Sequence, residues 1–522
     1  MSPLSSPARR TLLRATAAAS AGLALPATVA APAFARSGRP HARWGVQSGA
    51  VTGSSGLVWT RSDRPARMLV ETSATDSFRR VRRWRGPLLG PGSDFTGTTA
   101  LRGLPPGERI HYRVTLADPD DPRRTGEPVY GTFRTAETRR RRGVRFLWSG
   151  DIAGQGWGIN PDIGGMRAYE EMRRLDPDFF LCSGDSIYAD GVIEPRVTLP
   201  DGRVWRNVTT EEKAKVAESL AEFRGNFRYN LLDANVRRFN ARVPTVAQWD
   251  DHEVRNNWYP GQILDDPRYR EKDVDVLARR ALRAFGEYTP TGSPTGPGRG
   301  GRMHRVVRRG PLLDVFVLDM RSYRNANSPG RQADDTQGIL GAEQLAWLKR
   351  ELARSRAVWK VLAADMPLGL VVPDGATDIE AIAQGDPGAP LGRELQIADL
   401  LRFIKHRGIT GTLWLTADVH YTSAQHYAPE RAAFQDFAPF WEFVSGPLAA
   451  GGFPANALDA TFGPRRVFVR APERANVSPM ESPQYFGEVD IDGDSGELTV
   501  RLRAEGGVVL FRQVLSPGRV GQ

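Results

Sequence analysis

Short apolar runs alternate with amphipathic segments along most of the chain from Val144 onward. Three segments with helix-period apolar residues lead directly into such runs: "IGGMRAYEEMRRLDPDFFLCSGD", "EQLAWLKRELARSRAVWKVLAAD" and "ELQIADLLRFIKHRGITGTLWLTAD". Helices that alternate with apolar strands are the sequence form of an α/β sheet covered by helices. The pattern therefore predicts an α/β domain over residues 143–517.

Before this domain, residues 40–136 carry short β-prone runs such as "ARMLVETSA" and "IHYRVTLA", separated by Gly, Pro, Ser and Asp turns. Strands of that length and spacing are typical of a β-sandwich. The stretch "GLPPGERIHYRV" resembles the tyrosine-bearing corner of fibronectin type III domains. We expect a small all-β domain of the fibronectin or immunoglobulin type here, without obvious chemistry of its own.

Residues 1–35 have the pattern of an export signal. Paired arginines precede an Ala-rich, weakly apolar stretch, and "AFA" forms a small-x-small cleavage site, which resembles a twin-arginine signal. A transmembrane anchor is the alternative, but two prolines interrupt a stretch that is too weakly apolar for a span. The pattern predicts export by the twin-arginine machinery to the periplasm, the cell surface or the medium, with no transmembrane segment in the mature chain.

The chain of 522 residues is basic, with a formal charge of +11. Removal of residues 1–35, which carry three arginines and no acidic residue, lowers this charge to +8. A basic protein can bind nucleic acid or anionic surfaces. However, only six of the 71 basic residues are lysine, and the arginines are spread along the chain. We interpret this as a coding bias and expect no stable nucleic-acid binding.

Six apolar runs end in aspartate. These residues are Asp151, Asp185, Asp250 with Asp251, Asp319, Asp365 and Asp418. The carboxyl ends of strands in an open α/β sheet form one rim, where ligands bind. Carboxylates that meet there repel one another unless a cation neutralises them, and the set therefore predicts a metal cluster. A helix N-cap is the usual role of a single aspartate at a strand end.

Histidine and tyrosine complete the candidate ligand set. His252 lies in "WDDHEVRNN", and Asp418 and His420 lie two positions apart in "TADVHYTS", so that they share one side of a strand end. Tyr188, three residues after Asp185, offers a hard phenolate donor that favours a trivalent ion such as iron(III). Cys182 is the only cysteine, which excludes an intrachain disulfide and a cysteine-rich metal site.

Four blocks in order, "SGDSIYADG", "WDDHEVRNNW", "LDMRSYR" and "TADVHYTS", resemble the alkaline phosphatase D (PhoD-like) family of the metallophosphoesterase superfamily. The resemblance covers nearly the whole mature chain and implies a metallophosphoesterase-type β-sandwich flanked by helices. It places metal ligands at Asp151, Asp185, Tyr188, Asp251, Asp418 and His420, with Asp185 as the bridging residue. Asp365 falls near the superfamily's intermediate histidine.

One departure from the family pattern bears on the metal. Members of the family have a cysteine as an iron ligand near the end of the first strand, where this chain has Asp151. The resemblance implies iron with calcium. A site made only of oxygen and nitrogen donors is also compatible with manganese, magnesium or zinc.

The resemblance implies hydrolysis of phosphomonoesters, phosphodiesters or both, by a metal-bound hydroxide at a site that includes Asp185. His252 is the candidate to donate to the leaving oxygen or to stabilise the equatorial charge, and Arg255 and Arg321 are candidates to hold a phosphoryl oxygen. A non-catalytic, metal-stabilised extracellular binding protein is the alternative. The sequence contains no G-x-x-x-x-G-K-[ST] or G-x-S-x-G motif, which argues against a P-loop enzyme and a serine hydrolase.

Overall fold

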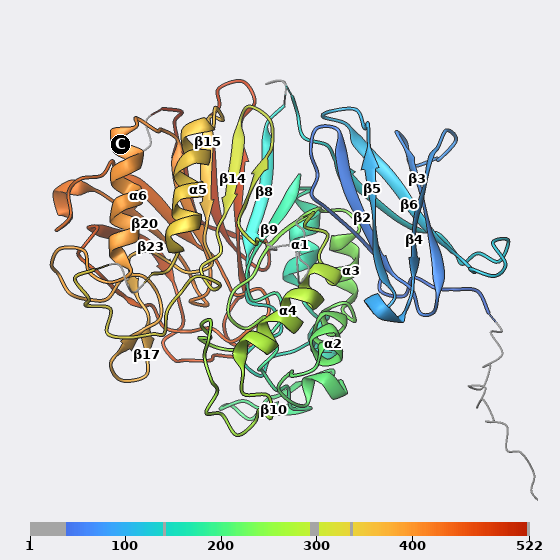
Figure 1. Ribbon diagram of the computed structural model, residues 1–522, viewed down its shortest axis with the longest axis horizontal. Helices are drawn as coiled ribbons and strands as arrows, with labels where there is room; N and C mark the ends of the chain where they lie inside the picture. Colours follow the sequence, from blue (N-terminus) through green and yellow to red (C-terminus); the bar gives the residue numbers. More distant parts are fainter. Residues whose placement is uncertain (1–37, 139–141, 293–301, 335–337, 519–522) are drawn as a thin grey trace, which may run out of the picture. The chain divides into compact units, whose positions relative to one another are not determined.

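The computed structural model describes residues 38–138, 142–292, 302–334 and 338–518. The predicted export signal, residues 1–35, lies outside the described residues. Two large sheets dominate the fold (Figure 1). In order across the nine-stranded sheet, the strands are β26 (Val509–Leu515), β25 (Leu498–Ala504), β24 (Tyr485–Ile491), β8 (Val144–Ser149), β9 (Phe179–Ser183), β12 (Thr245–Gln248), β1 (Val46–Gly49), β2 (Ser55–Arg61) and β5 (Thr96–Arg102). The seven-stranded sheet has the order β13 (Arg305–Arg308), β14 (Leu313–Val317), β15 (Trp359–Ala363), β19 (Thr412–Thr416), β21 (Phe440–Val444), β20 (Thr422–Tyr427) and β23 (Pro464–Arg470).

The two sheets pack face to face, and helices cover their outer faces. Alternation along β9 explains the layers: Phe179 and Leu181 point into the core between the sheets, while Phe180 and Cys182 point toward helices. A strand buried on both faces has a continuous apolar sequence, as "FFLC" does. The expected α/β sandwich flanked by helices is therefore confirmed.

The helices divide between the two outer faces. Those over the nine-stranded sheet are α1 (Ala168–Arg174), α2 (Leu220–Asn230), α3 (Ala234–Asn240) and α4 (Val274–Tyr288), and those over the seven-stranded sheet are α5 (Gly341–Arg354) and α6 (Glu394–His406). A capping box formed by Ser219 and Glu222 begins α2, and the Asp273 side chain caps α4.

All six apolar runs that end in aspartate form strands, but they divide between the two sheets. β8, β9 and β12 are parallel neighbours in one sheet, and β14, β15 and β19 are parallel neighbours in the other. The two sets of carboxyl ends meet because the sheets face each other. The side-chain amide of Gln248, at the end of β12, donates to the carbonyls of Leu318 and Ala363 at the ends of β14 and β15.

The N-terminal region is all-β, as expected, and is hydrogen-bonded into the larger sheet. Its four-stranded sheet has the order β4 (Arg82–Leu89), β3 (Ala66–Ser73), β6 (Arg109–Ala117) and β7 (Val129–Arg134). β1, β2 and β5 form its other layer, and β1 pairs in parallel with β12 through Gly49 and Thr245. Asp94, in the loop before β5, also accepts hydrogen bonds from Arg228 of α2 and Tyr288 of α4.

Short two-stranded ladders lie in the loops at the edges of the sheets: β10 (Arg196–Thr198) with β11 (Val204–Arg206), β16 (Leu370–Val371) with β22 (Ala457–Leu458), and β17 (Pro373–Asp374) with β18 (Asp378–Ile379). Within the described ranges, no helix is both long enough and apolar enough to cross a lipid bilayer.

Candidate metal centre

Left-handed backbone turns direct the predicted ligands into one space. The φ angle is +63° at Asp151, +46° at Asp185, +69° at Asp418 and +58° at His420. A non-glycine residue in this region costs of order 1 kcal/mol or more and is frequent at functional sites. Asp151, Asp185 and Asp418 each lie two residues after the end of a strand, and His420 lies two residues before β20.

Glycine is required where two of these turns approach each other. Gly184 has φ +92°, and a Cβ at this position would lie 2.4 Å from the Cβ of Asp250. The "SGD" at the end of β9 therefore allows the Asp185 turn to pack directly against the end of β12. This close approach brings together carboxylates that are far apart in the sequence.

Asp151, Asp185 and His420 each offer one donor atom, and these atoms lie within 4.8 Å of one another. The Nδ1–H of His420 donates to the carbonyl of Gly451 at 2.6 Å, so Nε2 carries the lone pair. Burial lowers the pKa of His420 to about 4, which keeps the ring neutral. Nε2 accepts from the hydroxyl of Tyr188 at 2.8 Å. A neutral imidazole held by a backbone carbonyl is how histidine ligates metals in proteins.

Two further groups of donors adjoin the first. Asp185, Asp251 and His252 form one group, and Asp250, Asp251 and Asp418 form the other, each again within 4.8 Å. Burial, followed by neighbouring carboxylates, raises the pKa of Asp185 well above its usual range. The burial of such carboxylates without a compensating cation is costly.

The donor set fits metal ions. Several buried carboxylate oxygens have no hydrogen-bond partner within the described structure: Asp151 Oδ2, Asp250 Oδ2 and Asp251 Oδ1. Buried acceptors are nearly always paired in proteins, so unpaired oxygens that converge on one space indicate cations. The donors are carboxylates, two imidazoles and one phenol, which suits hard or borderline metals. Cys182 is not among them, because its thiol is buried on the helix-facing side of β9.

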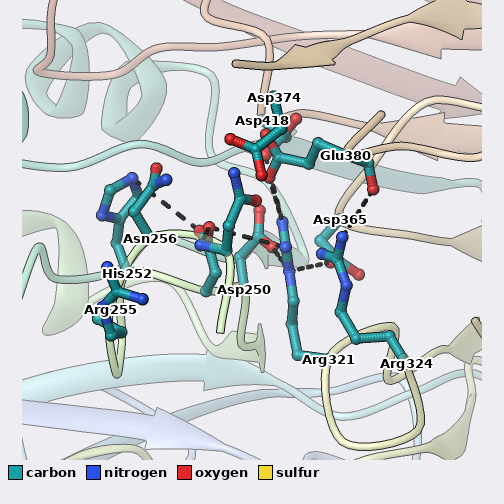
Figure 2. Close-up of polar contacts among 12 residues, drawn as sticks. Asp250, His252, Arg255, Asn256, Arg321, Arg324, Asp365, Asp374, Glu380 and Asp418 are labelled. Atoms are coloured by element: carbon teal, nitrogen blue, oxygen red, sulfur yellow. Dashed lines mark hydrogen bonds and ion pairs between the residues drawn. The ribbon is translucent and has the colours of Figure 1, made fainter. Parts of the chain in front are cut away.

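Arg321 is the one arginine among the described residues that forms ion pairs with the carboxylates of the cluster, and Arg324, also buried, lies beside it. Its side chain is 0% exposed and forms ion pairs with five acids: Asp250, Asp251, Asp365, Glu380 and Asp418. Figure 2 shows it rising between Asp250 and Asp365, with its guanidinium directed toward Asp418 and Glu380. The charge of Arg321, together with that of the nearby Arg324, neutralises only part of this cluster. Arg321 is therefore an internal counterion in this structure.

His252 forms a pair with Asp190. The Nδ1–H of His252 donates to Asp190 Oδ1 at 2.7 Å, and Asp190 Oδ2 accepts from the backbone N–H of Asn256 at 2.8 Å. Burial alone would lower the pKa of His252, but Asp190 and then Asp251 raise it to about 10 in the metal-free site. The ring stacks on Tyr188 with centroids 4.3 Å apart. The arrangement fixes the tautomer and leaves Nε2 free to act.

Glu253 ties together the turns that carry two of the aspartates. Its carboxylate accepts from the backbone N–H groups of Asp185 (3.2 Å), Ser186 (2.7 Å) and Asp250 (2.7 Å), and from the hydroxyl of Ser186 (2.6 Å). The side chain is buried. Sequence reasoning missed this residue, although its position next to His252 in "WDDHE" was a signal.

A cavity of about 320 Å³ opens above the donors. Asp185, Asp251, His252, Asp418 and His420 contribute to its floor, and Glu380, which the sequence did not indicate, also lines it. The rest of the wall combines amides with apolar side chains: Gln155, Asn256, Asn456, Val372, Pro373, Val419, Phe453 and Pro454.

The two arginines expected to hold a phosphoryl oxygen do not line this cavity. Arg321 contacts carboxylates below it, as described above. Arg255 is half-buried, and its Nη1 lies 3.5 Å from Oε1 of Gln262. In Figure 2, Arg255 lies below His252, on the same loop.

The structure brings most of the predicted residues together. Asp151, Asp185, Tyr188, Asp251, His252, Asp418 and His420 surround one space, and Asp365 lies beside it through Arg321. Asp319 differs from the other strand-end aspartates. Its carboxylate accepts from the indole of Trp249 and from the backbone of Arg321 and Ser322, which is the turn-capping role typical of a single aspartate.

Comparison with known proteins gives consistent matches. The sequence profile of the PhoD-like phosphatase family matches residues 146–502, and that of the PhoD-like phosphatase N-terminal domain matches residues 28–137. The chain is similar to alkaline phosphatase D of Bacillus subtilis (strain 168), with 31% identity over 306 residues. That match covers 55% of this chain and 48% of the relative, so it spans about half of the relative's length.

Two solved structures share the fold. A structure of PhoD aligns with a TM-score of 0.70 at 21% identity, over 93% of this chain and 90% of that one. Purple acid phosphatase PPD1 from yellow lupin (Lupinus luteus) seeds aligns with a TM-score of 0.57 at 13% identity, over 92% and 74%. At these identities the likeness concerns the fold alone, and it agrees with a sandwich that follows an all-β domain.

Proposed function

The chain belongs to the PhoD-like phosphatase family, and we propose that it is a metal-dependent phosphoric ester hydrolase. The observation that carries the proposal is a cluster of buried carboxylates with unpaired oxygens, grouped with a neutral His420 and with Tyr188, next to a cavity lined by Asp185, Asp251, Asp418 and His420. His252 lines the same cavity and has its Nδ1 fixed by Asp190.

The ligands divide into two adjoining positions. Asp151, Asp185, Tyr188 and His420 would hold one ion, and Asp250, Asp251 and Asp418 would hold a second, to which Asp185 would also contribute. Iron at the position with the phenol and calcium at the position with the carboxylates are the identities that we favour, because phenolate prefers a trivalent ion and calcium prefers oxygen donors. When bound, the two ions would activate the attacking water and neutralise the phosphoryl oxygens.

The protein's own groups would orient the substrate and move the proton. His252 Nε2 would donate a proton to the leaving oxygen, since Asp190 holds Nδ1 and stabilises the imidazolium form. The side chains of Asn256 and Asn456 in the cavity wall would donate to phosphoryl oxygens. We assign this contact to them instead of Arg255 and Arg321, which do not line the cavity.

Export accompanies this activity in our proposal. Residues 1–35 have the twin-arginine pattern, and the twin-arginine route carries folded proteins, which suits a protein that acquires metal before export. The protein would then act outside the cytoplasm on phosphate esters. Phosphomonoesters and phosphodiesters are both candidate substrates.

Turnover of a chromogenic phosphomonoester and of the matching phosphodiester tests the function. Both rates are measured with the purified full chain before chelation, after chelation and after addition of single metals, with metal content determined in parallel. We expect activity that chelation removes and metal restores, and loss of both metal and activity in Asp185→Asn. Asp319→Asn is the matched control, because Asp319 is a buried strand-end aspartate outside the donor groups. Bound metal without turnover of either ester would instead support a metal-stabilised binding protein.

A further inference from the structure

The positive charge of the mature protein is concentrated in its N-terminal domain. Residues 40–136 contain 15 arginines, no lysine and nine acidic residues. Residues 137–522 contain 51 basic and 51 acidic residues. Arginine is frequent throughout the chain, but only the N-terminal region has a substantial excess over acids. An uneven charge distribution of this kind indicates an anionic partner for the basic part.

The excess arginines gather on one edge of the N-terminal domain. β4 is an edge strand of the four-stranded sheet, and the sequence that leads into it and through it is "RRVRRWR" (Figure 1, at the right). We define the arginine ridge as Arg79, Arg80, Arg82, Arg83, Arg85 and Arg102. All six residues are exposed. Arg102 belongs to the ridge because the Arg82 guanidinium donates to the adjacent carbonyl of Gly103 at 3.0 Å.

Acidic residues neutralise little of this ridge. Glu71, which lies opposite Arg83 in the sheet, pairs with Arg83 at 2.8 Å and with Arg113 at 2.6 Å. Arg79, Arg80, Arg85 and Arg102 form no ion pair or hydrogen bond through their side chains among the described residues. Their guanidinium groups are therefore available to a ligand.

The spacing of the ridge suits a linear polymer. Arg83 and Arg85 are alternate residues of β4 and therefore lie about 6.6–7 Å apart on one face, while Arg79 and Arg80 continue the row before the strand. Guanidinium groups bind phosphate oxygens in pairs. A single small ester gains little from several exposed arginines, whereas a polymer releases one counterion for each contact. Bases have little to stack on, because Arg82 covers Trp84 at 4.7 Å and the exposed ring of Tyr130 packs against Phe78.

We propose that the arginine ridge is a docking surface for a linear, phosphate-rich polymer without bases. Hydrolysis of a polymer docked at the ridge would depend on the proposed function. Docking alone is independent of that function, because the ridge belongs to the N-terminal domain and shares no residue with the metal centre.

Binding of long-chain inorganic polyphosphate to the full chain tests the proposal, at several salt concentrations. Arg79→Gln, Arg80→Gln and Arg85→Gln are combined in one variant. The matched control combines Arg279→Gln, Arg350→Gln and Arg356→Gln, which remove the same charge from exposed arginines of the α/β domain. We expect the ridge variant to bind at least ten-fold more weakly at about 100 mM salt, with a salt slope smaller by about two to three, and the control to bind as wild type does.

Equal binding by the two variants, or equal weakening, would overturn the proposal. A single-stranded DNA of matched charge that binds the wild type more tightly than polyphosphate does would also overturn it, in favour of nucleic acid. Turnover of the small chromogenic ester separates the two proposals. If the ridge binds polyphosphate while the wild type hydrolyses no ester, the docking surface is supported and the proposed function fails. If the wild type hydrolyses the ester while the ridge variant binds polyphosphate as the wild type does, the proposed function is supported and the docking surface fails.

Discussion

The Nδ1 atom of His252 lies 2.7 Å from Oδ1 of Asp190, and the second oxygen of Asp190 is fixed by the backbone N–H of Asn256. The carboxylate comes from the loop after β9 and the histidine from the loop after β12. The pair therefore joins the ends of two adjacent strands and aligns the imidazole within the cavity wall. A proton donor that is already held in position needs little reorganisation when the reaction takes place.

Asp190→Asn tests whether Asp190 aligns the His252 imidazole for catalysis without contributing to substrate binding. The charge of Asp190 stabilises the imidazolium form of His252, so its removal lowers the pKa of the histidine and weakens the fixed tautomer. We expect kcat to fall about 10²-fold with a small change in KM, and the alkaline limb of the pH–kcat profile to move to lower pH. Asp201→Asn, an exposed acid with only a local partner, is the control. An unchanged pH profile would show that Asp190 has a structural role alone.

Glu253→Gln tests whether metal affinity depends on the hydrogen bonds by which Glu253 holds the backbone at Asp185 and Asp250. A glutamine has one acceptor oxygen for four donors, so the Asp185 and Asp250 turns lose part of their shared anchor. We expect metal affinity to fall about 10- to 100-fold, with activity partly restored by excess metal. Metal titration of activity gives this measurement.

Glu218→Gln is the matched control for Glu253→Gln. Glu218 also accepts from two backbone N–H groups, of Arg270 and Glu271, and belongs to none of the donor groups. If both variants show the same metal affinity as the wild type, Glu253 does not position the ligands.

Arg321→Met tests the internal counterion. Its removal leaves five carboxylates with less compensation, and breaking a buried ion pair from one side typically costs about 3–5 kcal/mol. We expect a large drop in Tm in the presence of chelator and a smaller drop with saturating divalent metal, because added cations replace part of the lost charge. Differential scanning calorimetry under both conditions gives the comparison.

Arg305→Met is the control for the loss of a half-buried guanidinium that donates to backbone carbonyls. Arg305 donates to the backbone carbonyls of Ala247 and Met303, and no ion pair of this residue with a carboxylate occurs in the described structure. Its replacement should lower Tm by a similar amount with and without metal. The same metal dependence in both variants would contradict the role of Arg321 as a counterion.

Strand-end aspartates made much of the metal centre predictable from the sequence. A buried strand leaves a clear apolar run, and parallel strands end at one edge, so Asp151, Asp185 and Asp418 could be expected together. The division of the strands between two sheets was not visible in this pattern, because an apolar run does not specify which sheet it joins. Asp319 shows the limit of the argument, since a strand-end aspartate can also turn back to cap its own loop.

The sequence did not indicate Glu380, and it predicted a different partner for Arg321; both residues lie on loops. Glu380 follows β18, far from any apolar run, and reaches the cavity only because its loop folds over the strand ends. Arg321 was expected to face a phosphate, yet the number of carboxylates around it could be known only after the two sheets were assembled. Long-range packing decides such side-chain partners, and local sequence carries little information about it.

Glu442 provides a test of stability against pH away from the metal ligands. This glutamate lies inside β21 and accepts from the hydroxyl of Tyr427 at 2.5 Å, the backbone N–H of Leu368 at 2.8 Å and the hydroxyl of Thr416 at 3.4 Å. Burial raises its pKa from an ordinary 4.5 to about 7. The folded state therefore holds this proton more tightly than the unfolded state does. The associated stability is fully present below pH 4.5 and is lost as pH rises through 7, by about 3 kcal/mol in total.

Glu442→Gln removes this dependence, because an amide does not ionise. We expect the free energy of unfolding of the variant, relative to wild type, to rise between pH 4.5 and 7 by up to about 3 kcal/mol and then to level off. Denaturant unfolding in chelator from pH 4.5 to 9 measures the difference. Glu430→Gln, at an exposed position, should show a small and flat difference over the same range. A flat difference for Glu442→Gln as well would mean that the buried carboxyl is ionised throughout, stabilised by its three donors despite its burial.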